Sequence, residues 1–286
     1  MKCKYAGCDH ESDHRPYSKD RIPSVSTIAG LLDNNKSRGF AWSASLIAAS
    51  VAVHEPERWR GLVDQMTDRA AQNGYHECTQ TKDGLCKACN YLRSEHDRVW
   101  RAKADLGGHV HHLALQWAQG EKVLTDPIVD PYMDALQGFY GAHGPLFVEL
   151  ERTVLCDSPK VLSYRGQFDF IADIRCPDPA HERCRWLIDI KTGGFHVLEQ
   201  TLQLVGYRNA THITDWKDGT ETIIRSMPAV GHCGVLLLGG DGEFRLVELA
   251  ADNKAAKAFT QLRDLWGFAE RMRRWEKDLD KQEKTV

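Results

Sequence analysis

An aspartate and a lysine stand two residues apart in Asp189-Ile190-Lys191, inside an apolar run that is typical of a buried strand. Because side chains alternate along a strand, Asp189 and Lys191 are expected on the same face near the strand's end. Such a pair suits phosphodiester hydrolysis: the carboxylate holds a divalent cation, and the lysine orients the attacking water and stabilises developing charge. A chain of this length holds about one Asp-x-Lys match by chance, so a solvated ion pair is the alternative.

A second carboxylate, Asp169, lies in the preceding apolar stretch between Phe168 and Phe170. An unpaired charge there would cost several kcal/mol unless it meets a cation. A hairpin between the two strands would bring Asp169 beside Asp189, and Mg²⁺ or Mn²⁺ between them would remove their repulsion. The alternative is a buried aspartate that caps a turn.

Further polar residues flank these strands. Gln203 and Tyr207 are one helical turn apart and therefore share a helix face, where an amide and a phenol can bind the substrate backbone or steady the lysine. Upstream, a predicted helix carries His109, His111 and His112, and Glu151 lies on the first predicted strand. One imidazole and one carboxylate would complete a metal site, since His is a ligand for Mn²⁺ although Mg²⁺ prefers oxygen.

In this order, Gly166-x-x-Asp169, Asp189-x-Lys191 and Gln203-x-x-x-Tyr207, after a histidine-bearing helix, resemble the PD-(D/E)XK nucleases of the RecB and CRISPR-adaptation exonuclease type. They resemble most the stand-alone versions encoded by phages. The segment that starts Ile22-Pro23-Ser24, with the later Trp42, is similar to the beginning of those phage proteins, so the resemblance runs from about residue 22 to 250.

The resemblance implies a role for each matched residue. His111, Asp169 and Asp189 would bind Mg²⁺ or Mn²⁺, and Lys191 would assist the water. Gln203 and Tyr207 would support substrate binding, and Glu151 matches the family's first-strand glutamate. His111 is chosen over its two neighbouring histidines because the family's histidine follows a small-residue pair, here Gly107-Gly108, by about this interval.

The implied function is that of a metal-dependent DNA nuclease. It would be an exonuclease or end-processing enzyme of recombination or replication that acts on DNA ends or single strands, with a recombination or replication protein as a further partner. Two alternatives stay open: a structure-specific endonuclease, and a DNA-binding or regulatory protein that keeps the nuclease fold.

The odd number of cysteines, nine, predicts reduced thiols and metal ligation rather than a disulfide framework. His76, Cys78, Cys86 and Cys89 have the spacing of a tetrahedral zinc site, to which Cys3 and Cys8, with His10 and His14 nearby, would add a second site or further ligands. Related nucleases often hold an iron–sulfur cluster with one cysteine before the core and three after it. Only Cys233 follows the core motifs here, and the interleaved imidazoles favour zinc. Free thiols in a polar loop are the alternative, and the other cysteines, Cys156, Cys176, Cys184 and Cys233, are expected to be structural or incidental.

The elements that must position these residues follow from apolar periodicity. The order is helices, three strands, a helix, two strands and a helix, which predicts an α/β core over 101–286 and an N-terminal helical lobe with a Cys/His metal-binding insert over 1–100. The resemblance implies that the α/β core is a PD-(D/E)XK core, a central mixed sheet flanked by helices. The expected helices cover about 24–32, 41–53, 99–119, 131–140, 197–210 and 252 onward, the strands 147–155, 163–174, 185–190, 233–238 and 243–249, and a loop 74–90.

Charge and hydropathy narrow the class of protein to which the chain can belong. With 37 Lys and Arg against 40 Asp and Glu, the net charge is −3, so any contact with DNA must be local. The chain begins with polar residues and holds no run of about 18 apolar residues, which predicts a cytoplasmic protein without a membrane partner.

Overall fold

The computed structural model describes residues 22–32, 57, 87–157, 162–176, 180–217 and 220–283. The chain divides into two compact units, one formed by 1–33 with 107–286 and the other by 34–106. The lobe predicted over 1–100 stays a prediction, and its helix over 41–53 lies outside the described residues. So do His76, Cys78, Cys86 and the segment with Cys3 and Cys8, and no side chain is described for Cys89.

The core of the first unit is a seven-stranded mixed sheet with the strand order β5-β4-β1-β2-β3-β6-β7. Its β3–β6 pair is parallel and its other pairs are antiparallel. The strands are β1 (Leu146–Cys156), β2 (Tyr164–Arg175), β3 (Arg183–Lys191), β4 (His212–Lys217), β5 (Thr220–Ser226), β6 (His232–Leu238) and β7 (Phe244–Glu248).

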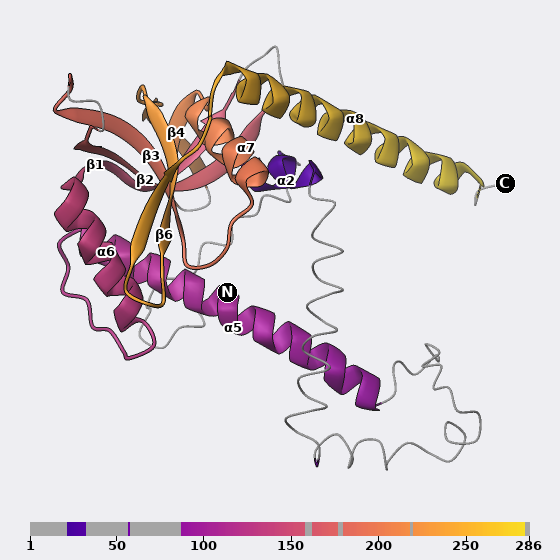
Figure 1. The fold of residues 1–286 in the computed structure, drawn as a ribbon. Helices are drawn as coiled ribbons and strands as arrows, with labels where there is room; N and C mark the ends of the chain where they lie inside the picture. Colours follow the sequence, from indigo (N-terminus) through magenta and orange to yellow (C-terminus); the bar gives the residue numbers. More distant parts are fainter. Residues whose placement is uncertain are drawn as a thin grey trace. The chain divides into compact units, whose positions relative to one another are not determined.

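Helices lie on both sides of this sheet, with α6 on one side and α7, α2 and α8 on the other (Figure 1). The α/β prediction and the five predicted strands are therefore confirmed. Strands β4 and β5 were not predicted, because β5 is an edge strand with nearly every residue exposed and lacks a buried alternation. The helices are α2 (Val25–Ala29), η1 (Gly30–Leu32), α5 (Lys87–Ala118), α6 (Asp130–His143), α7 (Val197–Arg208) and α8 (Asn253–Glu283).

Helix α5 begins earlier than predicted. The sequence analysis placed residues 74–90 in a loop, but the helix starts at Lys87 and includes Cys89. Its first turns contain no Gly or Pro before Gly107, so nothing in that stretch interrupts a helix that continues from the predicted one. The backbone at Cys89 is thus helical, and the loop interpretation is wrong at that residue.

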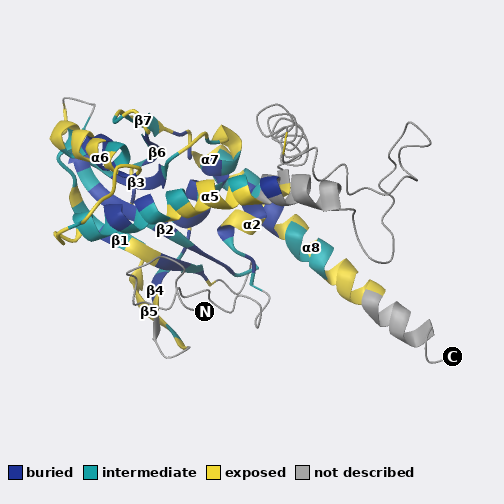
Figure 2. Cartoon of the chain, turned by 90° about the horizontal axis from the view of Figure 1, so that it is seen from below, coloured by how far each residue is buried: buried dark blue, intermediate teal, exposed yellow. Residues whose placement is uncertain are grey.

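The buried core forms where α2, α7 and α8 pack on the sheet, and Figure 2 shows it as the dark blue centre of the unit. Glycines make this packing close. A Cβ atom at Gly206 would lie 2.7 Å from Val25 and 2.8 Å from Phe259, so the small residue on α7 lets α2 and α8 approach it. None of the described helices is long and apolar enough to cross a membrane.

The cysteines of the core do not all follow the prediction. Cys176 and Cys184, which flank the β2–β3 turn, form a disulfide, whereas the sequence analysis expected only reduced thiols. The hairpin causes the difference, because antiparallel pairing brings the two Cα atoms to 4.9 Å, well within the range that a disulfide spans. Among the described residues Cys156 and Cys233 are free and buried.

Candidate active site

Asp169 and Asp189 lie where the β2–β3 pairing ends. The antiparallel register runs as far as Phe170 and Ile188, and Asp169 and Asp189 are the next residues beyond that pair on their strands. The negative charge of Asp169 raises the pKa of Asp189, so the two carboxylates are close enough to interact. The structure thus brings together the two carboxylates that the sequence analysis singled out.

Asp169 is the more strongly ionised of the two. One carboxylate oxygen accepts a hydrogen bond from the Ile190 backbone N–H at 2.6 Å, and the other lies 3.5 Å from His111 Nδ1. Burial raises the pKa of Asp169, but His111, the Ile190 N–H and Lys191 favour the carboxylate and together lower its pKa below the ordinary value. Asp169 is therefore a carboxylate across the physiological pH range.

Asp189 behaves in the opposite way. Its side chain is only 6% exposed, and burial together with the negative charge of Asp169 raises its pKa to about 6. Lys191 Nζ lies 2.6 Å from Asp189 Oδ2 and opposes this shift. The Asp189 carboxylate is therefore buried with the Lys191 ammonium as its closest positive charge.

Lys191 is held as a cation. Burial lowers its pKa, but Asp189, Asp169 and Glu199 more than offset this and raise the pKa above the ordinary value. An ammonium with a raised pKa cannot serve as a general base at neutral pH. The arrangement instead gives Lys191 the role of a fixed positive charge beside the two carboxylates.

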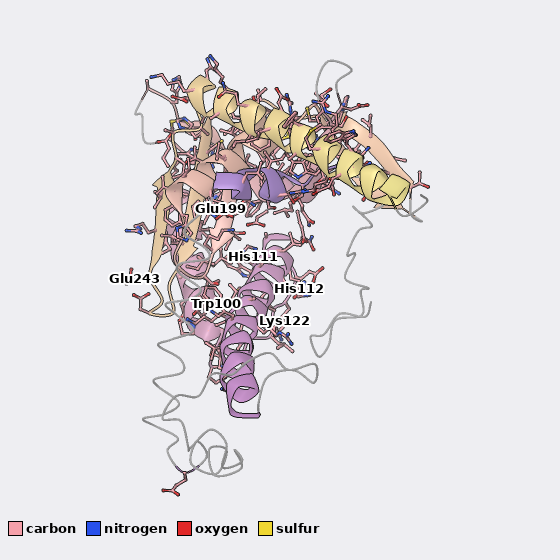
Figure 3. The ribbon with its side chains drawn as sticks, turned by 90° about the vertical axis from the view of Figure 1, so that its right-hand side faces the viewer. Trp100, His111, His112, Lys122, Glu199 and Glu243 are labelled. Atoms are coloured by element: carbon pink, nitrogen blue, oxygen red, sulfur yellow. A yellow bond between two sulfur atoms is a disulfide. The ribbon has the colours of Figure 1, made fainter. Side chains whose placement is uncertain are left out.

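Glu199, in the first turn of α7, was not selected from the sequence. It acts on Lys191 through its charge, and Figure 3 labels it together with His111 of α5. An acidic residue in the first turn of the helix that follows Asp-x-Lys is the signal that would have revealed it, since such positions also complement the helix dipole.

His111 reaches the carboxylates because α5 approaches the end of β3 closely. Gly107, one turn earlier on the same helix face, would place a Cβ atom 3.2 Å from Thr192 Oγ1. Burial lowers the pKa of His111, but Asp169 raises it by charge and by a hydrogen bond, and the net effect is a raised pKa. The predicted histidine is thus paired with a predicted carboxylate.

Gln203 and Tyr207 contact each other as their helical spacing predicts. Gln203 Nε2 donates to the Tyr207 hydroxyl at 2.7 Å. Tyr207 is only 2% exposed and packs on β2, where a Cβ atom at Gly166 would come within 2.4 Å of its ring. Tyr207 therefore supports Gln203 from within the core, and a direct role in substrate binding remains a prediction for Gln203.

Glu151 lies on β1 with a backbone φ of 43°, in the left-handed region that non-glycine residues seldom adopt. Together with His111 and Asp169 it forms the polar end of a cavity. Strained backbones of this kind cost on the order of 1–3 kcal/mol and cluster at functional sites. The rest of the cavity is apolar and is lined by Ala114, Leu115, Ala118, Leu136, Tyr140, Phe147, Leu150, Phe170 and Ile190.

The donor set fits a hard divalent cation. Two carboxylates and an imidazole interact with one another, and oxygen and imidazole nitrogen are donors that Mn²⁺ accepts. The ligand atoms of this set do not all lie within 4.8 Å of one another; among the described residues, only Cys176, Cys184 and His232 do. These ligand atoms lie apart because the Asp189 carboxylate points to Lys191 and the Asp169 carboxylate points to the Ile190 N–H.

Neither a scan against protein-family models nor a search of curated proteins finds a match. The site is therefore interpreted from its own geometry and charge.

Proposed function

We propose that the protein is a Mg²⁺- or Mn²⁺-dependent DNA nuclease with a PD-(D/E)XK core, acting as an exonuclease or end-processing enzyme. The observation that carries the proposal is the interacting pair of carboxylates Asp169 and Asp189, with Lys191 beside Asp189 and His111 beside Asp169. Such a concentration of buried charge weakens a fold unless it serves chemistry or binds a cation.

The order of the elements supports the same proposal. Three antiparallel strands, β1 to β3, lead into helix α7, and after β4 and β5 the chain returns to the sheet as β6, which pairs parallel with β3. The polar residues extend from the middle of β2 to the end of β3 and include the half-buried Glu199 and Gln203 of α7. A ligand site near the carboxyl ends of parallel strands is the usual place in an α/β sheet.

Each residue contributes a separate function. Asp169, Asp189 and His111 would hold the metal, which when bound lowers the pKa of a coordinated water and neutralises charge on the phosphate. Lys191, kept protonated by its neighbours, stabilises negative charge that develops on the phosphate oxygens. Gln203, oriented by Tyr207, offers its amide to the substrate beside Lys191.

The decisive experiment is a cleavage assay with four substrates: linear and covalently closed double-stranded DNA, single-stranded DNA and RNA. Each is incubated with Mn²⁺, with Mg²⁺ or with EDTA. Metal-dependent release of nucleotides from linear DNA supports an exonuclease, and cutting of closed circles supports an endonuclease. Binding of DNA without cleavage in either metal would contradict the proposal.

Asp173→Asn provides a matched control for Asp169→Asn. Asp173 is on the same strand, four residues further on, and forms a two-point ion pair with Arg185. Both variants remove one carboxylate from β2, but only Asp169→Asn removes one from the site. If Asp169→Asn loses cleavage and Asp173→Asn retains it, the activity belongs to this protein and to this site.

A further inference from the structure

Three potential metal ligands meet at the turn between β2 and β3, away from the catalytic carboxylates. Cys176 follows β2 directly, Cys184 is the second residue of β3, and His232 begins β6. The two sulfur atoms and a ring nitrogen of His232 all lie within 4.8 Å of one another. No described residue outside this group forms a three-ligand cluster of that compactness.

The sheet itself places the histidine there. In the parallel β3–β6 pair Trp186 is the partner of His232, and the two rings stack with centroids 4.8 Å apart and planes inclined by 14°. Cys184 lies two residues before Trp186 and therefore on the same face of β3. Stacking fixes the imidazole in one plane beside the sulfur atoms.

A carboxylate completes the arrangement. Glu248 of β7 contacts His232 Nδ1 at 2.7 Å, which leaves Nε2 as the nitrogen that is free to coordinate a metal. A carboxylate that holds the second nitrogen of a coordinating histidine is a common feature of metal sites, because it fixes the tautomer and raises the basicity of the ligand. A disulfide alone requires neither the histidine nor the glutamate.

We propose that Cys176, Cys184 and His232 form a zinc site whenever the disulfide is reduced. Reduction by two molecules of a small thiol breaks the S–S bond and yields two cysteine thiols and the disulfide of the reductant. Binding of Zn²⁺ then releases the two thiol protons and forms two Zn–S bonds and one Zn–N bond. All three residues are half-exposed, so a water molecule supplies the fourth ligand.

The site has a structural role rather than a catalytic one. Cys184 and Asp189 are five residues apart on β3, which corresponds to about 16 Å along the strand. A metal at the β2–β3 turn therefore cannot touch a phosphate held by Asp189. It joins the turn to β6 in the reduced protein, as the disulfide closes the turn in the oxidised protein.

Differential thiol labelling of the full chain tests the proposal at the level of single cysteines. The protein is reduced with a phosphine, freed of reductant, and alkylated with or without Zn²⁺ or with EDTA, and the rate at each cysteine is read by peptide mass mapping. We expect Zn²⁺ to slow the labelling of Cys176 and Cys184 by at least about tenfold, and EDTA to restore it. A re-formed disulfide would resist EDTA, so the two causes of protection are distinguished.

Histidine variants separate this site from any other that the chain's cysteines form. In His232→Ala the protection of Cys176 and Cys184 should disappear. In His212→Ala, which changes a histidine at the start of β4 that hydrogen-bonds to the neighbouring Thr211, the protection should persist. Glu248→Gln should weaken the apparent affinity for Zn²⁺ by about tenfold or more, because the imidazole loses its orienting partner. Equal labelling with and without Zn²⁺ in the wild type, or protection that survives His232→Ala, would overturn the proposal.

Discussion

Asp169 and Asp189, on the neighbouring strands β2 and β3, have pKa values shifted in opposite directions: that of Asp169 is lowered and that of Asp189 is raised to about 6. The cause is their shared environment, in which His111 and the Ile190 N–H stabilise one charge while that charge and burial oppose the other. A second positive charge would allow both carboxylates to ionise, which is the electrostatic reason to expect a cation here.

The affinity for Mn²⁺ should depend on pH through Asp189. The pKa of Asp189 is raised to about 6 in the folded protein, so its carboxyl group is mostly protonated below about pH 6. A protonated carboxyl group is a weak metal ligand. Below that pH, the affinity should fall by about tenfold per pH unit. Calorimetric titration with Mn²⁺ at pH 5, 6, 7 and 8 measures this, and Asp189→Asn should bind weakly with a much flatter dependence on pH. An affinity independent of pH in the wild type would place the metal elsewhere.

Loss of Lys191 should reduce cleavage more than it reduces folding. In the proposed nuclease, Lys191→Ala would remove the cation that stabilises the phosphate, which corresponds to a loss in kcat of about 10²–10³-fold. Thermal unfolding and kcat are compared for this variant and for Lys254→Ala, which changes an exposed lysine at the start of α8. Near wild-type turnover in Lys191→Ala would contradict the assigned site.

Gln203→Ala and Tyr207→Phe should each lower the rate by less than the loss of a metal ligand does. Gln203→Ala removes the amide offered to the substrate, and Tyr207→Phe removes only the hydroxyl that orients this amide. Their effects should therefore overlap, so that the double variant is little worse than Gln203→Ala alone. Full additivity of the two losses in a double-mutant cycle would show that the residues act separately.

Gly107 should be required for the position of His111. In Gly107→Val the side chain meets Thr192, which a Cβ atom alone would approach to 3.2 Å, and α5 is pushed from the end of β3. Cleavage should fall at least about tenfold. Gly141→Val is the matched control, since Gly141 is also helical but has no atom within 4 Å of its added Cβ. Equal activity of the two variants would rule out this close approach as a requirement.

The carboxylates and the lysine were predictable because strand alternation and a hairpin are local rules. Asp189 and Lys191 share a face of β3 by their spacing alone. The hairpin between β2 and β3 is enough to bring Asp169 of the preceding strand close to Asp189. The contact between Gly107 and Thr192 and the ion pair of His111 with Asp169 were not derivable from local rules. They depend on how α5 packs on the sheet, and only the resemblance to a family singled out His111.

The Cys176, Cys184 and His232 cluster shows the same limit. Sequence spacing directed attention to His76, Cys78, Cys86 and Cys89, where ligands are close along the chain. The cluster in the core instead needs the β3–β6 pairing, which no pattern within either strand specifies. Ligands brought together by strands from distant parts of the chain therefore escape spacing rules that detect metal sites within a single loop.

Substitution of Glu151 should separate backbone strain from charge. Glu151→Gln keeps the positive φ of the residue and removes its charge, whereas Glu151→Gly removes the charge and also relieves the strain, because glycine adopts this φ without a steric penalty. If Glu151 contributes to the metal site, both variants should cleave more slowly than the wild type.

Only Glu151→Gly should also become more stable, by up to about 1 kcal/mol. A non-glycine residue in the left-handed region costs about 1–2 kcal/mol, which the substitution relieves. Part of this gain is lost because glycine makes the unfolded chain more flexible. Chemical denaturation with EDTA present measures the stability of the metal-free protein, and the cleavage assay with Mn²⁺ measures the rate. Full activity in Glu151→Gln would exclude the charge from catalysis. Equal stability of the two variants would instead show that the strained φ is compensated locally, for example by the contacts of Glu151 at the cavity that it shares with His111 and Asp169.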